Sequence, residues 1–298
     1  MGAIVKMKIC IVMVDNRPVD GRLMTAEYNS VVACINANYA EKNGYDFCYY
    51  ILTAGAGGGV NCVVDPWKRG VLRHAAWGKI LAMRHHIQER ARGEYDYVVY
   101  VDSDCAFVGG GNARRIEDIV EECMTDESVH TVFLNNYPQN PEYPNTGFFI
   151  CKVGDEAVKF LDKWFTTKED TGSEEWGQIT ESQRRAWAVE CPHPSGIAHK
   201  DIDVEPWEYG RYWEQDAMWL MVHREGNYRT LGIKLFCKEV MFFPTDGQML
   251  LHLYSPYGNE TRKHVFVQYL RKLGIAHRYH TIADELVKNK VVEIDFTK

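Results

Sequence analysis

The sequence lacks several features that would assign a protein class at once. Its first apolar run, residues 9–14, is too short for a membrane helix and leads directly into Asp15-Asn16-Arg17-Pro18, which is typical of a buried strand. No two of its nine cysteines have the CxxC spacing of a zinc or redox site. The glycine-rich residues 55–59 lack the later residues of a dinucleotide or P-loop motif. The chain is therefore expected to contain no membrane segment and no standard phosphate loop.

Positive charge is also scarce. The 298 residues include 34 Lys and Arg against 41 Asp and Glu, which gives a net charge of −7. No basic arm interleaved with aromatic residues occurs, and this argues against nucleic acid as a partner. A hydrophobic content of 46% is ordinary for a folded protein with a sizeable core. An anionic small-molecule substrate would therefore require local positive charge or a metal ion.

The cysteines are scattered through expected strands and helices, as in a protein with buried thiols in a reducing compartment. The one sequon, Asn259-Glu260-Thr261, falls in a segment expected near the active site, where a glycan would obstruct a ligand. The expected location is cytoplasmic, with the Golgi lumen as the alternative if the chain is a piece of a longer protein. Nothing in the sequence specifies an oligomeric state.

Strand and helix patterns alternate over the first part of the chain. The expected strands are residues 8–14, 46–52, 97–101 and 129–135, and the expected helices are residues 28–43, 74–92 and 116–124. Such alternation predicts an α/β fold with a mainly parallel central sheet flanked by helices. In these sheets ligands bind beyond the carboxyl ends of strands, so the residues after Val14 and Val101 are of most interest.

The second part of the chain is less regular. A loop containing Pro138, Pro141 and Pro144 precedes an apolar segment at residues 146–151, and residues 167–209 have no clear period. Further helices are expected at residues 155–165, from about 215, at 264–272 and at 280–289, with a strand at 249–253. With no repeat or linker, residues 1–298 are expected to form one domain. Its first part is about 7–135 and its second part about 136–298.

The strongest local motif is Asp102-Ser103-Asp104, which directly follows the apolar strand. Side chains at i and i+2 of an extended chain project to the same side, so the two carboxylates can share a cation. Mg²⁺ and Mn²⁺ favour such oxygen ligands and leave positions for diphosphate oxygens. The alternative is a polar turn or helix cap, but the position after a buried strand favours a metal site.

An ordered series of segments accompanies this motif. They are Ala76-Trp77-Gly78-Lys79-Ile80, Tyr100-Val101-Asp102-Ser103-Asp104, Asn145-Thr146-Gly147-Phe148-Phe149-Ile150, Phe160-Leu161-Asp162-Lys163-Trp164, Glu214-Gln215-Asp216-Ala217-Met218 and His252. In order and spacing, the series resembles the GT-A fold glycosyltransferases. Within that group it is similar to the galactosyl-, mannosyl- and xylosyltransferase family, which includes xyloglucan xylosyltransferases and yeast Golgi α-mannosyl and α-galactosyl transferases.

The resemblance implies a metal site and a donor site, with the nucleotide-sugar bound by the part at about 7–135 and the acceptor and catalytic groups held by the part at about 136–298. Asp102, Asp104 and His252 would be metal ligands, although a histidine on an apolar strand can also be a simple core residue. Residues that would contact the donor or acceptor are Lys79, Asp102, Ser103, Asn145 and Gly147. Lys79 could instead be a solvated helix residue.

A second group would act at the anomeric carbon. The resemblance assigns this role to Glu214, Gln215 and Asp216, whose alternative is an ordinary acidic first turn of a helix. The sequence departs from related enzymes after His252, where a Gly and a phosphate-binding Lys usually follow at shorter spacing. Arg262 or Lys263 is the candidate phosphate cation here.

Together these observations predict a glycosyltransferase that uses Mn²⁺ or Mg²⁺ to move a hexosyl or pentosyl unit from a nucleotide-sugar to a glycan hydroxyl. A UDP-sugar is preferred over a GDP-sugar, and the resemblance implies retention of configuration. The alternatives are an inverting enzyme with Glu214 or Asp216 as general base, and a glycan-binding protein of the same fold without turnover. A metal-dependent nucleotidyltransferase or phosphohydrolase is a further rival.

Overall fold

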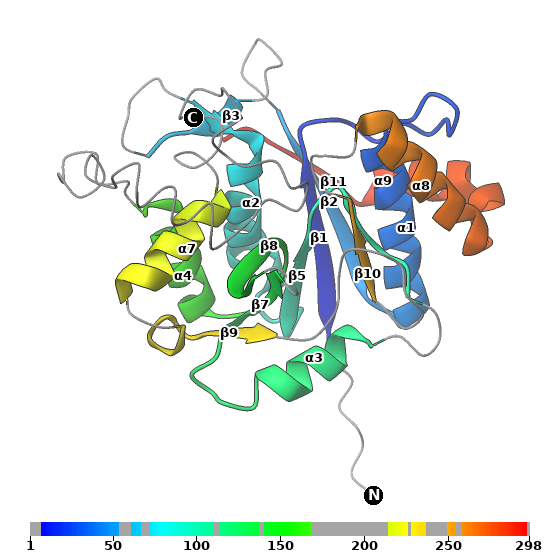
Figure 1. Cartoon of the computed structure of the whole chain (residues 1–298). Coiled ribbons are helices and arrows are strands. Elements are labelled where there is room, and N and C mark those ends of the chain that lie inside the picture. The colour runs from blue at the N-terminus through cyan, green and yellow to red at the C-terminus, as the bar shows by residue number, and fades with distance from the viewer. Residues whose placement is uncertain are drawn as a thin grey trace, which may run out of the picture.

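The chain is built around one seven-stranded sheet (Figure 1). The structure is a computed structural model, and it describes residues 7–53, 61–66, 72–109, 114–136, 140–167, 214–225, 228–236, 249–253 and 258–296. Most of the expected irregular segment at 167–209 lies outside these ranges. The sheet order is β11-β2-β1-β5-β8-β7-β9. The strands are β1 Ile9–Asp15, β2 Asp46–Leu52, β5 Tyr97–Val101, β7 Thr131–Asn136, β8 Asn140–Lys152, β9 Ile233–Phe236 and β11 Val291–Ile294.

The sheet is mainly parallel. Strands β11, β2, β1 and β5 pair in parallel, as do β7 and β9, whereas β8 is antiparallel to both of its neighbours, β5 and β7. In the register of β1 and β5, Met13 lies opposite Val101. The carboxyl ends of these strands therefore meet at one edge, where Asp15 ends β1 and Asp102 follows β5.

Helices cover both faces of the sheet (Figure 1). Their bounds are α1 Tyr28–Asn43, α2 Gly78–His86, α3 Ile116–Cys123, α4 Asp155–Phe165, α7 Glu214–Glu225, α8 Asn259–Lys272 and α9 Tyr279–Asn289. Alternate residues of β1 face opposite ways. Ile11 packs in the core with α1, α8 and α9, whereas Val12 packs in the core with α2, α4 and α7. The predicted α/β class with a mainly parallel, helix-flanked sheet is confirmed, while the division near residue 135 stays a prediction.

Three predicted elements differ from the structure by more than two residues. The helix predicted at residues 264–272 begins earlier, at Asn259. The helix predicted at residues 74–92 is a 3₁₀ turn, Ala75–Trp77, then α2, then a π-helical turn, Ile87–Ala91. The predicted proline loop belongs partly to β8, which begins at Asn140. The pairing of β7 with β8 shifts register in this region, and such irregularities accommodate prolines within a strand.

Short strands complete the described part of the chain. One two-stranded sheet joins β6, Cys105–Phe107, to β10, Leu250–His252, and another joins β3, Asn61–Val64, to β4, Leu72–His74. All seven cysteines in the described ranges are buried and not in disulfides, as expected of buried thiols. None of the helices in those ranges combines the length and apolarity needed to cross a membrane.

Candidate metal and donor site

Asp102 and Asp104 lie in the turn between β5 and β6. The N–H of Asp102 donates to the carbonyl of Gly147 on β8 at 2.8 Å, and the N–H of Cys105 donates back to the Asp102 carbonyl at 3.0 Å. The turn is therefore tied to the neighbouring strand as well as to itself. The Asp102 and Asp104 side chains keep 24% and 17% of their surface exposed, so they are reachable from outside. Ser103 lies between them and is half-buried.

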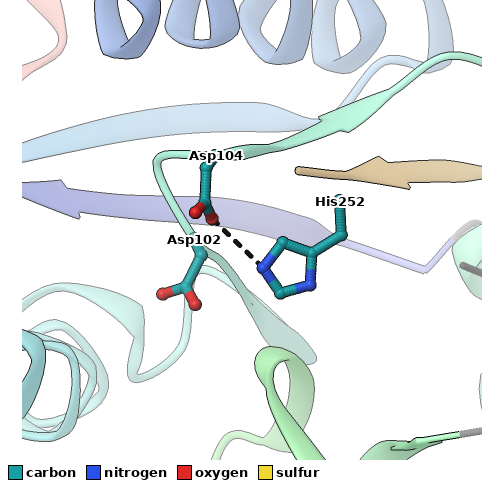
Figure 2. A group of neighbouring side chains, drawn as sticks. All are labelled: Asp102, Asp104 and His252. Carbon is teal, nitrogen blue, oxygen red and sulfur yellow. Dashed lines mark ion pairs between the residues drawn. The ribbon is translucent and has the colours of Figure 1, made fainter. Parts of the chain in front are cut away.

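His252 reaches the two aspartates because β10 pairs with β6. In that antiparallel register His252 lies opposite Cys105, the residue after Asp104. Its Nε2 is 3.1 Å from Oδ1 of Asp104, and Figure 2 shows the ring directed toward both carboxylates. One ligand atom from each of the three residues lies within 4.8 Å of the others. The three metal ligands implied by the resemblance are thus brought together.

Gly147 provides space beside this group. A Cβ at this position would lie 2.7 Å from Cε1 of His252, 3.0 Å from Oδ1 of Asn145 and 3.1 Å from Oδ2 of Asp102. Any larger residue would push on two of the three potential ligands. Asn145 is buried, and its side-chain oxygen accepts from the Gly147 N–H at 2.8 Å. The predicted donor residues Asn145 and Gly147 therefore border the acidic pair.

Lys79 connects the acidic pair to the start of α7. Its Nζ lies 2.9 Å from Oδ1 of Asp102, 2.7 Å from Oε1 of Glu214 and 3.3 Å from the Thr146 carbonyl. Burial alone would lower the pKa of this ammonium, but Asp102 and Glu214 together raise it above its usual value. An ammonium has three donors, and here protein acceptors surround it. A direct contact between Lys79 and a sugar donor stays a prediction.

The charge balance differs between the two aspartates. Burial has the largest effect on Asp104 and would raise its pKa, but His252, Arg262 and Lys79 lower it below its usual range. The opposite holds for His252. Burial would lower its pKa, but the charge of Asp104 raises the pKa above its usual value. Burial raises the pKa of Asp102, although Lys79 opposes this effect. A bound cation would favour the ionised form of both carboxylates.

Glu214 and Gln215 begin α7 and contact β8. Oε1 of Gln215 lies 3.3 Å from the Thr146 N–H and 3.2 Å from its Oγ1, which is also 3.1 Å from Oε1 of Glu214. The single hydroxyl proton can serve only one of these two acceptors at a time. Burial would raise the pKa of Glu214, but Lys79 lowers it, so the carboxylate is held ionised and paired. The side chain of Asp216 lies outside the described residues.

The two candidate phosphate cations point in different directions. Nη1 of Arg262, in the first turn of α8, lies 3.8 Å from Oδ2 of Asp104. Lys263 instead donates to the Met24 carbonyl at 3.0 Å. The structure therefore places Arg262, and not Lys263, beside the acidic pair. The sequence did not separate the two. Neighbouring residues on a helix face different directions, and which of them faces the site is known only when the orientation of the helix is known.

Tyr100 also belongs to the site, although it was not predicted from the sequence. Its hydroxyl donates to Oδ1 of Asp102 at 2.5 Å, and burial raises its pKa well above the usual value. Tyr100 precedes Asp102 by two residues, so the alternation of a strand puts both on one side, a signal that was available. Together with Lys79, Tyr100 engages one oxygen of Asp102 and fixes the orientation of the carboxylate.

The three potential ligands fit a divalent cation. Two carboxylates and one imidazole suit Mn²⁺ or Mg²⁺, and the group is partly buried, close together and oriented by neighbouring hydrogen bonds. The close approach of Gly147 keeps one side of the group free of side-chain atoms. The arrangement can therefore bind a metal ion together with an anionic ligand next to Arg262.

No protein-family model matches the chain, and no curated protein matches it. Among solved structures it is similar to a glycosyltransferase involved in the glycosylation of the major capsid of PBCV-1, with 11% identity, 87% of this chain and 99% of that chain covered, and a TM-score of 0.45. It is also similar to the galactosyltransferase LgtC in complex with donor and acceptor sugar analogs, with 13% identity, 89% and 96% coverage, and a TM-score of 0.39. The WbbM bifunctional glycosyltransferase matches with 10% identity, 93% and 53% coverage, and a TM-score of 0.47. At these low values the likenesses carry no argument about function, which rests on the site itself.

Proposed function

We propose that this chain is a metal-dependent glycosyltransferase of the GT-A type that transfers a sugar from a nucleotide-sugar to a glycan hydroxyl. The observation that carries the proposal is the convergence of Asp102, Asp104 and His252 within 4.8 Å, at the carboxyl end of β5. Ligands of open α/β sheets bind at this edge. The similar solved structures are named as glycosyltransferases, but the proposal does not rest on them.

Each residue has a proposed task in donor binding. Asp102, Asp104 and His252 would hold Mn²⁺ or Mg²⁺, which supplies positive charge that stabilises a departing diphosphate. Arg262 is proposed to bind a phosphate oxygen from the other side, since its guanidinium already lies near Asp104. Tyr100 and Lys79 keep Asp102 oriented. Ser103, Asn145 and Gly147 are proposed to border the donor.

Transfer with retention of configuration is the proposed outcome. An inverting enzyme needs a carboxylate that can take the acceptor proton, and Glu214 is poorly suited because Lys79 pairs with it and lowers its pKa. Gln215 is proposed to stabilise the positive charge that develops at the anomeric carbon, for which its amide oxygen would exchange its contacts with Thr146. The donor is proposed to be a UDP-sugar in preference to a GDP-sugar.

A panel of UDP- and GDP-sugars tests the proposal. The purified protein is incubated with each donor, with Mn²⁺ or with EDTA, and the release of nucleoside diphosphate is measured with and without small glycan acceptors. We expect Mn²⁺-dependent release for at least one donor, increased by an acceptor. Tight donor binding without release would instead support a glycan-binding protein without turnover. Release of nucleoside monophosphate and sugar 1-phosphate would support a phosphohydrolase, and formation of nucleoside triphosphate from added pyrophosphate would support a nucleotidyltransferase.

A further inference from the structure

A second set of side chains adjoins the acidic pair on the side of α1. The hydroxyl of Tyr28, the first residue of α1, accepts hydrogen bonds from Nη1 of Arg262 and from Nη2 of Arg17, each at 3.0 Å. Both guanidinium carbons also lie over the Tyr28 ring, at 5.0 Å and 4.5 Å from its centroid. One neutral side chain thus holds two arginines that the chain delivers from remote segments.

The two arginines are not equivalent. Arg17 is fully committed to protein partners, since Asp15 accepts from its Nε at 2.8 Å and its Nη2 at 2.6 Å, and Glu27 accepts from its Nη1 at 2.9 Å. A guanidinium bound by two carboxylates is rigid and has little capacity for a further anion. Arg17 therefore acts on Tyr28 as a fixed support.

Arg262 has the opposite character. It is buried, with 8% of its surface exposed, yet Oδ2 of Asp104 lies 3.8 Å from its Nη1, which is too far for a hydrogen bond. Among the described residues, its Nε has no hydrogen-bond partner. A buried guanidinium that retains unused donors is costly unless a ligand completes its shell. Its contact with the Tyr28 hydroxyl is what fixes the direction in which those donors point.

We propose that Tyr28, supported by Arg17, is a positioning residue that aims Arg262 at a phosphate of the donor. The inference rests on the proposed function for the identity of the anion, but the support itself concerns only the protein. The Tyr28 oxygen has two lone pairs, and the two guanidinium donors use both. Removing the hydroxyl keeps the aromatic ring and its contact with the guanidinium but removes the hydrogen bond that directs Arg262. Asp15 belongs to the same support, because it binds Arg17, which in turn binds Tyr28.

A double-mutant cycle measures the coupling of Tyr28 to Arg262. The Kd of UDP, and in parallel of GDP, is determined with saturating Mn²⁺ for wild type, Tyr28→Phe, Arg262→Gln and the double variant. Loss of one charge-assisted hydrogen bond predicts an increase in Kd of about tenfold for Tyr28→Phe. In the Arg262→Gln background the same change should have less than about a twofold effect, because Tyr28 acts through Arg262. Equal effects of Tyr28→Phe in both backgrounds overturn the proposal.

The Tyr95→Phe variant is the matched control. The Tyr95 hydroxyl donates to Asp46 near the opposite end of β5, so its loss should leave the nucleotide Kd unchanged. Crystal structures of ligand-free wild type and Tyr28→Phe give a second readout that needs no nucleotide. We expect the Arg262 guanidinium to change rotamer or lose order in the variant, and an Arg262 that keeps its position overturns the proposal. If wild type binds neither UDP nor GDP, the proposed function fails while the two crystal structures still decide the role of Tyr28.

Discussion

The two oxygens of Asp102 have different surroundings. Oδ1 accepts from the Tyr100 hydroxyl at 2.5 Å and from Lys79 at 2.9 Å, whereas Oδ2 lies on the side of Gly147. One oxygen is thus used to orient the carboxylate, and the other remains directed to the space shared with His252. Carboxylates that bind metal ions are commonly hydrogen-bonded in this way, because the outer partners orient the ligand and contribute about 10- to 100-fold to affinity.

Replacing either aspartate with asparagine should abolish metal binding without unfolding the protein. An amide keeps the shape of the side chain but loses the charge that holds a hard cation. We expect the Kd for Mn²⁺ to rise by more than about 100-fold in Asp102→Asn and in Asp104→Asn, since even groups that only orient a ligand contribute about 10- to 100-fold. Calorimetry with Mn²⁺ alone measures the change. Asp284→Asn, an exposed residue on α9, is the control, and unchanged Mn²⁺ affinity in both site variants would remove the basis of the metal assignment.

Gln215 is the residue expected to act on the transition state. If its amide oxygen faces a centre that gains positive charge, Gln215→Ala should lower kcat by about 100-fold, the scale for loss of one preorganised polar group. The Kd of the donor should change little, because the group acts mainly on the transition state. The measurement is kcat and donor Kd for the variant beside Gln268→Ala, an exposed residue of α8. Wild-type turnover in Gln215→Ala would mean that another residue lies beneath the sugar.

Short elements determine the site as much as long ones do. Within the described ranges, the three-residue strands β6 and β10 pair only with each other, yet their register places His252 opposite Cys105 and hence next to Asp104. The antiparallel strand β8 inserts between β5 and β7 and delivers residues 145–147 to the same edge. Without this reversed strand, β5 would have a parallel neighbour, and the carboxyl end of that neighbour would occupy the edge instead.

Gly147→Ala tests the close approach of β8 to the acidic pair. The added methyl group would meet His252 at 2.7 Å and Asp102 at 3.1 Å, so these side chains must move apart. We expect the Kd for Mn²⁺ to rise about tenfold, as when the orientation of a metal ligand is disturbed. Gly154→Ala, just beyond β8, is the matched control because a Cβ there meets nothing within 4 Å. Equal Mn²⁺ affinities for the two variants would show that Gly147 does not shape the site.

Elements with a strong local pattern were predictable from the sequence. Helices α1 and α4 and strands β2 and β5 have the predicted bounds, because the apolar residues of each segment and the polar or charged residues that flank it are close together in the sequence. Strands β6, β9 and β11 were not predicted. They are three or four residues long and exist only through pairing with distant partners, which leaves no local signal.

The same distinction applies to the candidate site. Asp102 and Asp104 form one tripeptide after a buried strand, so their shared direction followed from strand geometry. The pairing of Lys79 with Glu214, and that of Tyr28 with Arg262, join segments that are far apart in the chain. Only the folded arrangement reveals them, and it changes the interpretation of Glu214 from a free acid to a partner of Lys79.

At the scale of the whole molecule, the site depends on the correct assembly of segments from the first and second halves of the chain. The proposed metal ligands come from the β5–β6 turn and from β10, while the neighbouring Arg262 comes from α8. In the unfolded chain Asp102 and Asp104 stay close, but His252 and Arg262 are remote from them. The native state should therefore bind a divalent cation far more tightly than the unfolded state does.

Metal binding should accordingly stabilise the folded protein. A ligand that binds only the native state adds about 2.7 kcal/mol at a concentration of 100 times its Kd. For a chain of this size, that amount corresponds to a rise in Tm of about 5 °C. Thermal unfolding is followed in EDTA and in increasing Mn²⁺ for wild type, Asp102→Asn and Asp284→Asn. Wild type and Asp284→Asn should show the rise, whereas Asp102→Asn should not. An equal rise in all three would place the cation elsewhere on the protein, and no rise in wild type would show that these three side chains do not hold Mn²⁺ in the absence of a nucleotide-sugar.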